Sequence, residues 1–347
     1  MQRKWDLLAL FLILAIGAIS LLVIFSINRS LATNQLVYWI IGLAVLCATS
    51  LFPYNNWQRL SVPFYAVVLI FLALLFFIGT PIRGSIRWID IGPFRFQPSE
   101  LAKIASIFLL ANFYSEKSAR QLKNLVTSFA IILPAVVLIF FEPDIGNSLA
   151  LLAIWFGASL ACGFRAKTMV TFALIAIVIA IFSYELLSSY QKDRIATFVN
   201  PTKDPLGTGY NIIQSKIAIG SGQLFGRGLG HGSQSQLNFL PEAESDFIFA
   251  SISEQLGFFG AILIVLLQGG LILRILSYVQ SAEKFGQLVI VGTASFLLIQ
   301  FLVNIGMNLG LLPVTGITLP LVSYGGSSLL STLFLLGVAF SVKRYQY

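Results

Sequence analysis

Long apolar runs separated by short polar segments restrict most strongly what this chain can fold into. A helix needs roughly 20 apolar residues to cross the hydrocarbon core of a bilayer, and ten runs approach or reach this length. They cover about residues 6–27, 36–52, 62–79, 99–113, 125–141, 147–163, 168–187, 247–273, 286–310 and 322–342. Charged residues make up only 10% of the chain, well below the share in soluble domains. The sequence therefore predicts an all-α, polytopic integral membrane protein with ten transmembrane helices.

One long segment, residues 188–246, separates the seventh and eighth predicted helices. No repeat, low-complexity tract or composition shift marks a second domain. We therefore interpret residues 1–347 as a single membrane domain, with 188–246 as its large extracytoplasmic loop. Arg3 and Lys4 precede a first apolar run that is too long for a signal-peptide core, so that run is expected to remain as a helix.

The basic residues predict the orientation in the membrane. If the N-terminus is cytoplasmic, 12 of the 22 Lys and Arg residues fall on that side and four fall in the short outer loops. This is the distribution that the positive-inside rule requires, and it places both termini in the cytoplasm. Nine of the 14 acids then lie outside, so we expect the chemistry to face outward. The net charge of +8 fits basic cytoplasmic loops better than a nucleic-acid partner, and the single histidine excludes a His-rich metal site.

The outer acidic stretch, residues 240–250, carries Glu242, Glu244 and Asp246 directly before an apolar run. An acid at the mouth of a membrane helix is costly and usually functional. A helix N-terminus would also help to keep Asp246 ionised, which suits a proton acceptor. Aspartate is equally a good helix N-cap. This pattern alone supports the two interpretations, catalytic base and helix cap, equally.

The outer loop at residues 80–99 is cationic, with Arg83, Arg87 and Arg95 beside Trp88. Arginine can bind phosphate through two parallel hydrogen bonds, and tryptophan suits a sugar face or the membrane interface. The loop is therefore either a site for a phosphate-bearing ligand or an aromatic belt with arginines at the lipid headgroups. We favour the ligand site.

Two further pairs of charged residues lie near this loop. Glu100 and Lys103 are three residues apart, hence on one face of the predicted 99–113 helix, which at 15 residues would rise only about 22 Å. They form either a self-neutralising buried pair or the polar wall of a cavity, and the rarity of membrane charges in packing favours the wall. Glu142 and Asp144 link two predicted helices on the outer face. For Asp144 a cap is at least as well supported as a catalytic role.

The last part of the chain shows a polar stripe and a broken backbone. Thr293, Gln300, Asn304 and Asn308 share one face of the 286–310 run, which indicates contacts between helices. Pro and Gly residues interrupt residues 311–328, where Ser323, Ser327 and Ser328 could satisfy the freed backbone groups; such breaks are tolerated where they line a cavity or pack on protein. The glycines at 220–222 and 226–228 lack the lysine of a phosphate loop, so they predict a flexible loop.

Several segments also resemble the SEDS family (shape, elongation, division, sporulation), in the order in which that family has them. These segments are Arg87–Gly92, Phe96–Lys103, Tyr190–Arg194, Leu240–Glu242 with Asp246–Phe249, and Leu319–Ser328. The sequences at 211–222 and 304–316 look more like the elongation members than the division members. The resemblance implies a peptidoglycan glycosyltransferase that polymerises lipid II, an undecaprenyl-pyrophosphate-linked disaccharide-peptide, on the outer face of the bacterial cytoplasmic membrane during cell elongation.

The resemblance also assigns roles to single residues. Asp246 matches the catalytic acid of the family, and Trp88, Glu100 and Lys103 match other positions held important. We take as substrate-binding candidates Arg83, Arg87, Trp88, Glu100, Lys103, Glu142, Asp144, Ser323 and Ser327. The family usually has His-Thr before the aspartate, where this chain has Glu244-Ser245. Glu244 and Asp246 could therefore hold a divalent cation, Mg²⁺ or Mn²⁺. A class B penicillin-binding protein and the elongation machinery are the implied partners.

This chemistry needs few protein groups. Lipid pyrophosphate is already a good leaving group, whereas the acceptor hydroxyl needs a base, so Asp246 with cationic help from Arg83, Arg87 or Lys103 suffices. A lipid II flippase is the alternative, because buried charges and broken helices also occur in transporters. The crowding of acids on the outer face favours the transferase, since a carrier would place its site near the midplane. A scaffold for other wall enzymes would need neither Asp246 nor the cationic loop.

Overall fold

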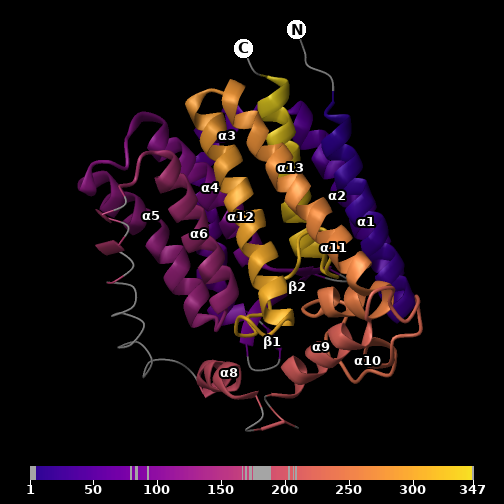
Figure 1. The fold of residues 1–347 in the computed structure, drawn as a ribbon. Helices are drawn as coiled ribbons and strands as arrows, with labels where there is room; N and C mark the ends of the chain where they lie inside the picture. The colour runs from indigo at the N-terminus through magenta and orange to yellow at the C-terminus, as the bar shows by residue number, and fades with distance from the viewer. Residues whose placement is uncertain are drawn as a thin grey trace.

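The computed structural model describes residues 5–78, 80–82, 85–91, 94–165, 167–168, 170–171, 174, 189–201, 204–205, 207 and 209–345. Long helices form a bundle, and the short elements other than η3 gather at the end opposite the two termini (Figure 1). The long helices are α1 (Leu7–Ile27), α2 (Arg29–Leu51), α3 (Asn55–Ile78), α4 (Pro98–Glu116), α5 (Leu122–Phe141), α6 (Ile145–Ala161), α11 (Ile248–Leu276), α12 (Lys284–Asn308) and α13 (Gly326–Arg344). The short ones are β1 (Thr80–Ile82), β2 (Ser85–Ile91), β3 (Phe94–Phe96), α8 (Ser189–Val199), α9 (Tyr210–Ser221), α10 (Ser233–Gln236) and η3 (Ser277–Ser281).

The predicted all-α membrane architecture is confirmed. Within the described ranges, seven helices are long and apolar enough to cross a membrane, and α6 is a shorter apolar helix of 17 residues. Most of the predicted run 168–187 lies outside the described residues. The helix predicted at 99–113 is longer than expected: α4 has 19 residues, a rise of about 28 Å. Charged residues interrupt its apolar sequence, so the apolar run is shorter than the helix.

The outer loop at 80–99 folds in part into a small antiparallel sheet, which the sequence analysis did not predict. The strand order is β1-β2-β3, with Thr80 opposite Trp88 and Ile89 opposite Phe96. Phe96 is followed at once by Gln97 and the start of α4. The sheet therefore fixes Arg87 and Trp88 at a set distance from the N-terminal end of α4.

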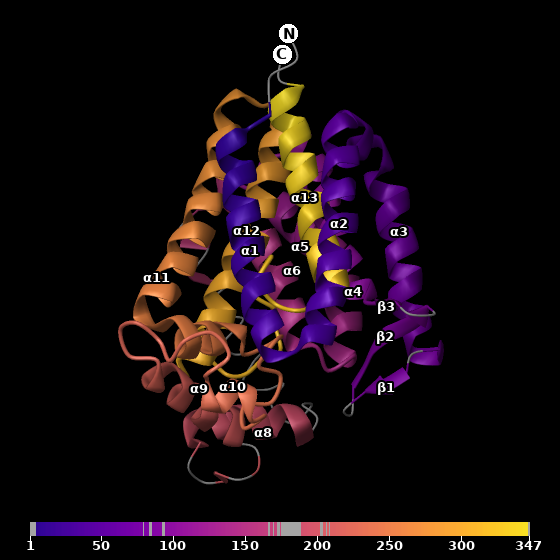
Figure 2. The same ribbon diagram turned by 90° about the vertical axis from the view of Figure 1, so that its right-hand side faces the viewer.

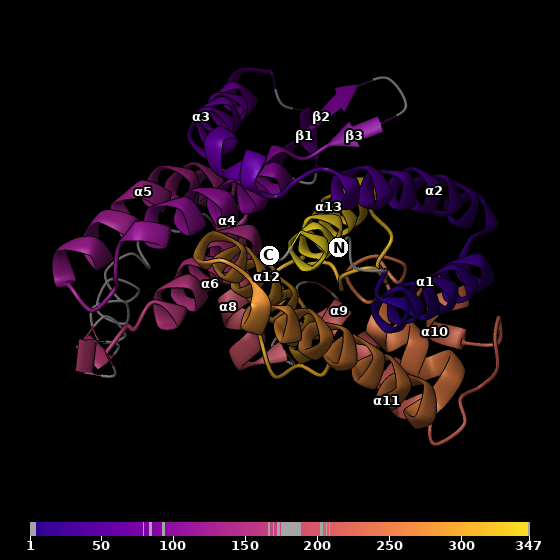
Figure 3. The same cartoon turned by 90° about the horizontal axis from the view of Figure 1, so that it is seen from above.

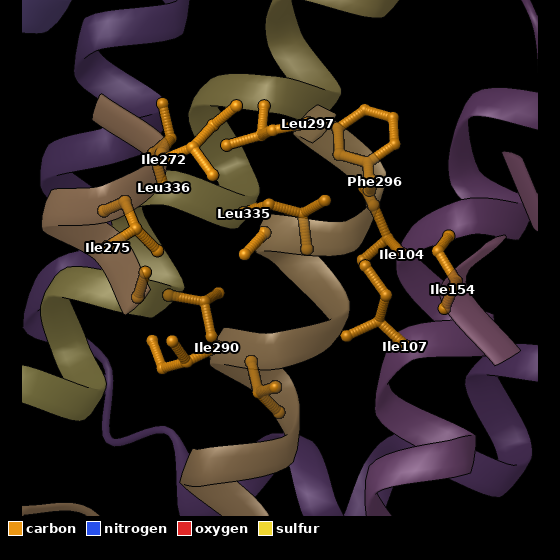
Figure 4. Packing of buried hydrophobic residues seen from close by; sticks show 14 of the residues in the cluster. Ile104, Ile107, Ile154, Ile272, Ile275, Ile290, Phe296, Leu297, Leu335 and Leu336 are labelled. Atoms are coloured by element: carbon orange, nitrogen blue, oxygen red, sulfur yellow. The ribbon is translucent and has the colours of Figure 1, made fainter. Parts of the chain in front are cut away.

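The centre of the bundle is formed by α4, α12 and α13, with the other long helices around them (Figure 3). Burial inside the protein is 61% for the apolar window of α12 and 67% for that of α13, against 28% for α2, α3 and α5. Figure 4 shows Ile104 and Ile107 of α4 close to Ile154 of α6 and Phe296 of α12. The outer helices leave apolar side chains exposed, as expected of a surface that faces lipid.

At the end of the bundle that carries both termini (Figure 2), Asp6 joins α1 to three other helical elements. Its carboxylate caps α1 by accepting from the backbone N–H of Ala9, and it accepts further hydrogen bonds from Arg274 Nε (2.8 Å), Tyr278 OH (2.8 Å) and Lys343 Nζ. Burial alone would raise the pKa of Asp6, but the bonds from Lys343, Ala9, Tyr278 and Arg274 outweigh it and lower the pKa below its ordinary range. This junction ties α1 to α11, η3 and α13.

We expect Asp6→Asn to lower the free energy of unfolding by about 2 kcal/mol, the usual scale of charge-assisted hydrogen bonds. Since folding lowers the Asp6 pKa, the advantage of the parent is complete above a pH of about 4, the ordinary value for aspartate, and fades below it. Thermal unfolding in detergent between pH 3 and 8 measures the difference. Glu283→Gln changes an exposed acid at the same end and should be neutral; equal stability of both variants at neutral pH would contradict the assignment.

Candidate active site

The backbone around Asp246 is held by two asparagines of α12. Asn304 Nδ2 and Asn308 Nδ2 each donate to the carbonyl oxygen of Asp246 at 3.0 Å. Asn308 Oδ1 also accepts from the backbone N–H of Ala250, at 3.0 Å, in the first turn of α11. The predicted contact between helices is thus confirmed for Asn308, which joins α12 to α11, and both asparagines hold the turn at residues 241–247. Thr293 of the same stripe instead donates within α12, to the carbonyl of Val289.

The same turn is held from its other side by the α12–α13 loop, residues 309–325. Ser323 Oγ donates to the carbonyl of Ser245 at 2.6 Å, and the N–H of Tyr324 donates to the carbonyl of Glu244 at 2.8 Å. Ser323 Oγ also accepts from the N–H of Leu319. The Ser323 hydroxyl therefore forms hydrogen bonds with backbone groups, as predicted from the Pro and Gly residues that interrupt this region.

The carboxylate of Asp246 faces this loop at a glycine. A Cβ atom on Gly316, whose φ is +76°, would lie 3.5 Å from Asp246 Oδ2. The Asp246 residue is half-buried. The N-cap of α11 is Phe247 rather than Asp246, which decides against the cap interpretation. The result is a partly accessible acid just before the positive end of a helix dipole, a position that favours its ionised form.

A second group of candidates lies at the start of α6. Asp144 caps this helix: its Oδ1 accepts from the N–H of Asn147 at 3.0 Å, and its Oδ2 accepts from Asn147 Nδ2 and Gln97 Nε2. Arg87 Nε lies 3.8 Å from Asp144 Oδ2, and the guanidinium donates to the carbonyls of Glu142 and Pro143. The cap role of Asp144 is confirmed, and Arg87 holds the α5–α6 connection.

Asn147 continues these contacts to the charged pair on α4. Lys103 Nζ donates to Asn147 Oδ1 at 3.0 Å and to Glu100 Oε1 at 2.6 Å, and Ser331 Oγ donates to Glu100 Oε2 at 2.5 Å. Lys103 is fully buried, with its Nζ 4.9 Å from the centre of the Phe296 ring. The polar chain thus runs from β2 through α6 and α4 to α13; its members are Arg87, Asp144, Asn147, Lys103, Glu100 and Ser331.

An apolar cavity of about 470 Å³ borders the polar chain. Aromatic and aliphatic side chains from α2, α3, α4 and α13 make most of its wall, and its polar lining consists of Tyr38, Trp57, Arg95, Glu100, Ser327 and Ser331. Ser327 Oγ donates to the carbonyl of Arg95 at 2.8 Å, and Arg95 itself is exposed. Glu100 is therefore both one partner of a buried ion pair and part of a cavity wall. The two interpretations of the pair, buried pair and cavity wall, both apply. The sequence pointed to Arg95 through its cationic loop, but the cavity was not predictable, because it depends on how distant helices pack.

The Asp246 turn and the polar chain share one structural neighbour. A Cβ on Gly146, near the start of α6, would lie 2.6 Å from Ile317 Cγ1 and 3.2 Å from the carbonyl of Thr315. Gly316, between them, faces Asp246. Arg194 of α8 donates to the carbonyl of Val314 at 2.7 Å. Residues 314–317 thus lie between the two groups of candidates. Trp88 is half-buried on β2, and Arg83 lies outside the described residues.

Glu142 differs from the other acids of the site. Its side chain is 1% exposed, and neither carboxyl oxygen has a hydrogen-bond partner among the residues that the structure describes. Burial, and then the nearby charge of Asp144, raise the pKa of Glu142 to about 9, although Arg87 acts in the opposite direction. Glu142 is therefore a neutral carboxylic acid at pH 7.

In the described part of the chain, no three His, Cys, Asp or Glu side chains converge so that they could hold a metal ion. Glu242, Glu244 and Asp246 share one turn, but Glu242 Oε2 accepts from Ser245 Oγ at 2.8 Å. Glu244 and Asp246 do not complete a donor set for Mg²⁺ or Mn²⁺, ions that prefer several oxygen ligands. No step of the mechanism below is assigned to a metal.

Comparisons with known proteins agree on one family. The chain matches the family model of the cell cycle proteins FtsW, RodA and SpoVE over residues 2–347. It is 36% identical to the peptidoglycan glycosyltransferase MrdB of Escherichia coli, covering 97% of this chain and 93% of that one. It is 37% identical to the stage V sporulation protein E of Bacillus subtilis, covering 98% and 97%.

Solved structures are similar over the whole length as well. The rod shape determining protein RodA of Thermus thermophilus, in an aspartate-to-alanine mutant, superposes with a TM-score of 0.76 at 28% identity, covering 99% of both chains. A chain from a structure of a peptidoglycan synthase complex, described as coordinating polymerization and crosslinking, gives a TM-score of 0.85 at 30% identity, again covering 99% of both.

The neutral state of Glu142 predicts an unusual pH dependence. Between the ordinary pKa of about 4.5 and the folded value of about 9, the folded protein holds a proton that the unfolded chain has lost. The parent should therefore lose stability relative to Glu142→Gln as pH rises through this window, by at most about 1.4 kcal/mol per pH unit. Thermal unfolding of both proteins from pH 5.5 to 8.5 measures the slope. A parallel pH profile for parent and variant would contradict a neutral Glu142, and Glu116→Gln, at an exposed acid, serves as control.

Proposed function

The chain belongs to the SEDS family of FtsW, RodA and SpoVE, and on that premise we propose that it polymerises lipid II into peptidoglycan glycan strands, with Asp246 as the general base. Its relatives are named peptidoglycan glycosyltransferases. The similarity to MrdB and RodA supports a role in cell elongation. The protein is a multi-pass membrane protein with several apolar spans, as an enzyme with a lipid-linked substrate requires.

The observation that carries the proposal is the way Asp246 is held. Two amide groups fix its carbonyl from α12, while its half-buried carboxylate lies beside Gly316, 3.5 Å from the point where a Cβ of that glycine would be. A base must reach the proton that it removes, and its position must be set before the substrate arrives. Fixing the backbone on one side and leaving the side chain partly accessible meets both requirements.

In the proposed reaction, the Asp246 carboxylate takes the proton from the 4-hydroxyl group of the acceptor sugar. The hydroxyl oxygen forms a bond to the anomeric carbon of the donor, and the bond from that carbon to the pyrophosphate oxygen breaks with inversion. Lipid pyrophosphate leaves with the electron pair. Because this leaving group is already a stable anion, a second carboxylic acid of the kind that glycosidases employ is not needed.

The cavity and the polar chain divide the remaining candidates into two groups. Glu100 and Ser327 line the apolar cavity, which suits the isoprenoid tail of the donor, with exposed Arg95 at its wall for the pyrophosphate. Trp88, half-buried on β2, offers a face to a sugar ring. Arg83 is proposed as a further phosphate-binding cation.

The other group acts on the protein itself. Arg87, Lys103, Glu142 and Asp144 are buried or half-buried in the wall, where the first two already have protein partners. Ser323 binds backbone groups of the Asp246 turn and the α12–α13 loop. We propose that these residues keep the wall of the substrate site in place.

Orientation and partner follow from the same premise. The termini lie at one end of the bundle and the site elements at the other (Figure 1). With the termini in the cytoplasm, as the basic residues predict, Asp246 faces outward, where lipid II is polymerised. A class B penicillin-binding protein is the proposed partner, supported by the similarity to a chain of a peptidoglycan synthase complex.

A flippase for lipid II remains the second candidate, and a specific observation favours it: Glu100, which pairs with buried Lys103, lines an apolar cavity. A flippase would move fluorescent lipid II across vesicles and leave it monomeric. The transferase would lengthen glycan strands in detergent, where no bilayer separates two compartments. The product in detergent therefore distinguishes the two functions.

We expect Asp246→Asn to assemble normally and to polymerise purified lipid II at least about 100-fold more slowly than the parent, the lower range for loss of a general base. Gel analysis of glycan chains measures the rate. Asp204→Asn changes an exposed acid of the same outer segment and should retain the parent rate. Undiminished chain growth by Asp246→Asn would refute its role.

A further prediction concerns Asn308. Its replacement by Ala removes one donor to the Asp246 carbonyl and leaves the N–H of Ala250 without its acceptor. We expect kcat to fall about tenfold with little change in KM, because a displaced base weakens the transition state more than binding. Asn112→Ala removes amide hydrogen bonds near the opposite end of α4. It should lower stability without lowering kcat, and an equal loss of kcat in both variants would mean that Asn308 acts on stability alone.

A further inference from the structure

Residues 222–229, termed the apolar loop, fill a break in α11. The helix is interrupted at Gly257, whose φ and ψ are 69° and −164°. Around this break the two segments exchange four backbone hydrogen bonds: Arg227 N to Glu254 O (2.9 Å), Gly228 N to Gln255 O (3.0 Å), Phe258 N to Gln223 O (2.8 Å) and Phe259 N to Leu224 O (3.2 Å). The loop thereby supplies partners for groups that the broken helix leaves unpaired.

The glycines of this loop allow the close approach. A Cβ on Gly222 would lie 1.9 Å from the carbonyl of Ser253, and one on Gly226 would lie 2.1 Å from the carbonyl of Gln255. The glycine pattern at 220–228 thus reflects close contact between two backbone segments. The prediction of a flexible loop here is wrong. The loop is fastened to α11 and must move with it.

The side chains of the apolar loop point away from the protein. Leu224 is 57% exposed and Phe225 is 80% exposed. The Phe225 ring lies 5.3 Å from that of Phe259, and Phe258 and Phe259 are themselves more than half exposed. This surface continues along α11 through Ile262, Leu263 and Leu266, all exposed on a candidate membrane span.

A polar rim accompanies the apolar surface. Arg227 and His231 line a shallow hollow of about 490 Å³ together with residues 221–226, and both side chains are exposed. Seen along the bundle axis, this part of the chain projects outward beyond α1 and α11 (Figure 3). Apolar tips beside a cation, continuous with a lipid-facing helix, are the pattern of a segment placed at the membrane interface.

We propose that the apolar loop is a membrane anchor that inserts Leu224 and Phe225 among the acyl chains of the outer leaflet, with Arg227 at the lipid phosphates. The first half of α11 leads from the loop's attachment point back to Ile248, two residues after Asp246. The depth of the anchor therefore sets the height of Asp246 above the bilayer. That consequence for catalysis rests on the proposed function, whereas the insertion itself does not.

The insertion is tested by fluorescence quenching, which does not depend on enzymatic turnover. Phe225→Cys in a cysteine-free background (Cys47→Ser, Cys162→Ser) is labelled with bimane and placed in nanodiscs of phosphatidylethanolamine and phosphatidylglycerol. We expect quenching by doxyl-labelled lipid and protection from iodide in the buffer. Val199→Cys on α8, 78% exposed, is the matched control and should show the reverse. Iodide quenching of residue 225 equal to that of residue 199, or shielding from both quenchers, would overturn the proposal.

The link to catalysis has its own readout. The double variant Leu224→Ser, Phe225→Ser changes only exposed side chains, so its thermal unfolding in detergent should match the parent. Its polymerisation rate in nanodiscs should fall at least about fivefold, while Phe225→Trp should retain the parent rate, because tryptophan also favours the interface. A double variant as fast as the parent would refute the link. A parent without polymerase activity would refute the proposed function and leave the quenching result intact.

Discussion

The hydrogen bonds from Asn304 and Asn308 to the carbonyl of Asp246 are the interaction on which the site depends. A bilayer offers no water to backbone groups, so an irregular turn at the end of a membrane helix needs partners from the protein. Two amides on neighbouring turns of one buried helix supply them from a fixed direction. The half-buried carboxylate of Asp246, the proposed base, lies beside the α12–α13 loop, 3.5 Å from the point where a Cβ of Gly316 would be. The same bonds satisfy the backbone and fix the position of the proposed base.

The lack of water in the bilayer also explains why the polar residues gather in two groups instead of lying separately. Along the polar chain Arg87 pairs with Asp144 and Lys103 pairs with Glu100, and the Asn147 amide hydrogen-bonds to Asp144 and Lys103. Burial of these charges therefore costs less than burial of single charges would. The polar chain joins β2, α6 and α4, and residues 314–317 separate this polar chain from the Asp246 turn. A lipid-linked donor in the apolar cavity would thus meet a preformed wall and a base that are held by different helices.

Sequence patterns predicted what depends on local chemistry. Apolar runs defined the membrane helices, because each span must satisfy its own backbone, and spacing on a helix identified Asn304 and Asn308 as inward-facing. The cap at Asp144 followed from its place between two runs. Packing between distant segments was not predictable. The sheet at 80–96, the cavity beside Glu100 and the break at Gly257 arise from contacts that no single segment encodes, and the partners that occupy Arg87 and Lys103 come from α6 and the α5–α6 connection.

Glu142 explains how the proposed pyrophosphate site can contain several acids and still attract an anion. Its buried carboxyl, which has no hydrogen-bond partner among the described residues, stays neutral at pH 7, because burial and the charge of Asp144 raise its pKa to about 9. Among the residues that the structure describes, Arg87 then pairs with Asp144, and Lys103 pairs with Glu100. Each of these two cations therefore faces one carboxylate. Two carboxylic acids in different environments would thus take different parts in the proposed reaction: Asp246, just before the positive end of the α11 dipole, is the proposed proton acceptor, whereas neutral Glu142 repels no phosphate.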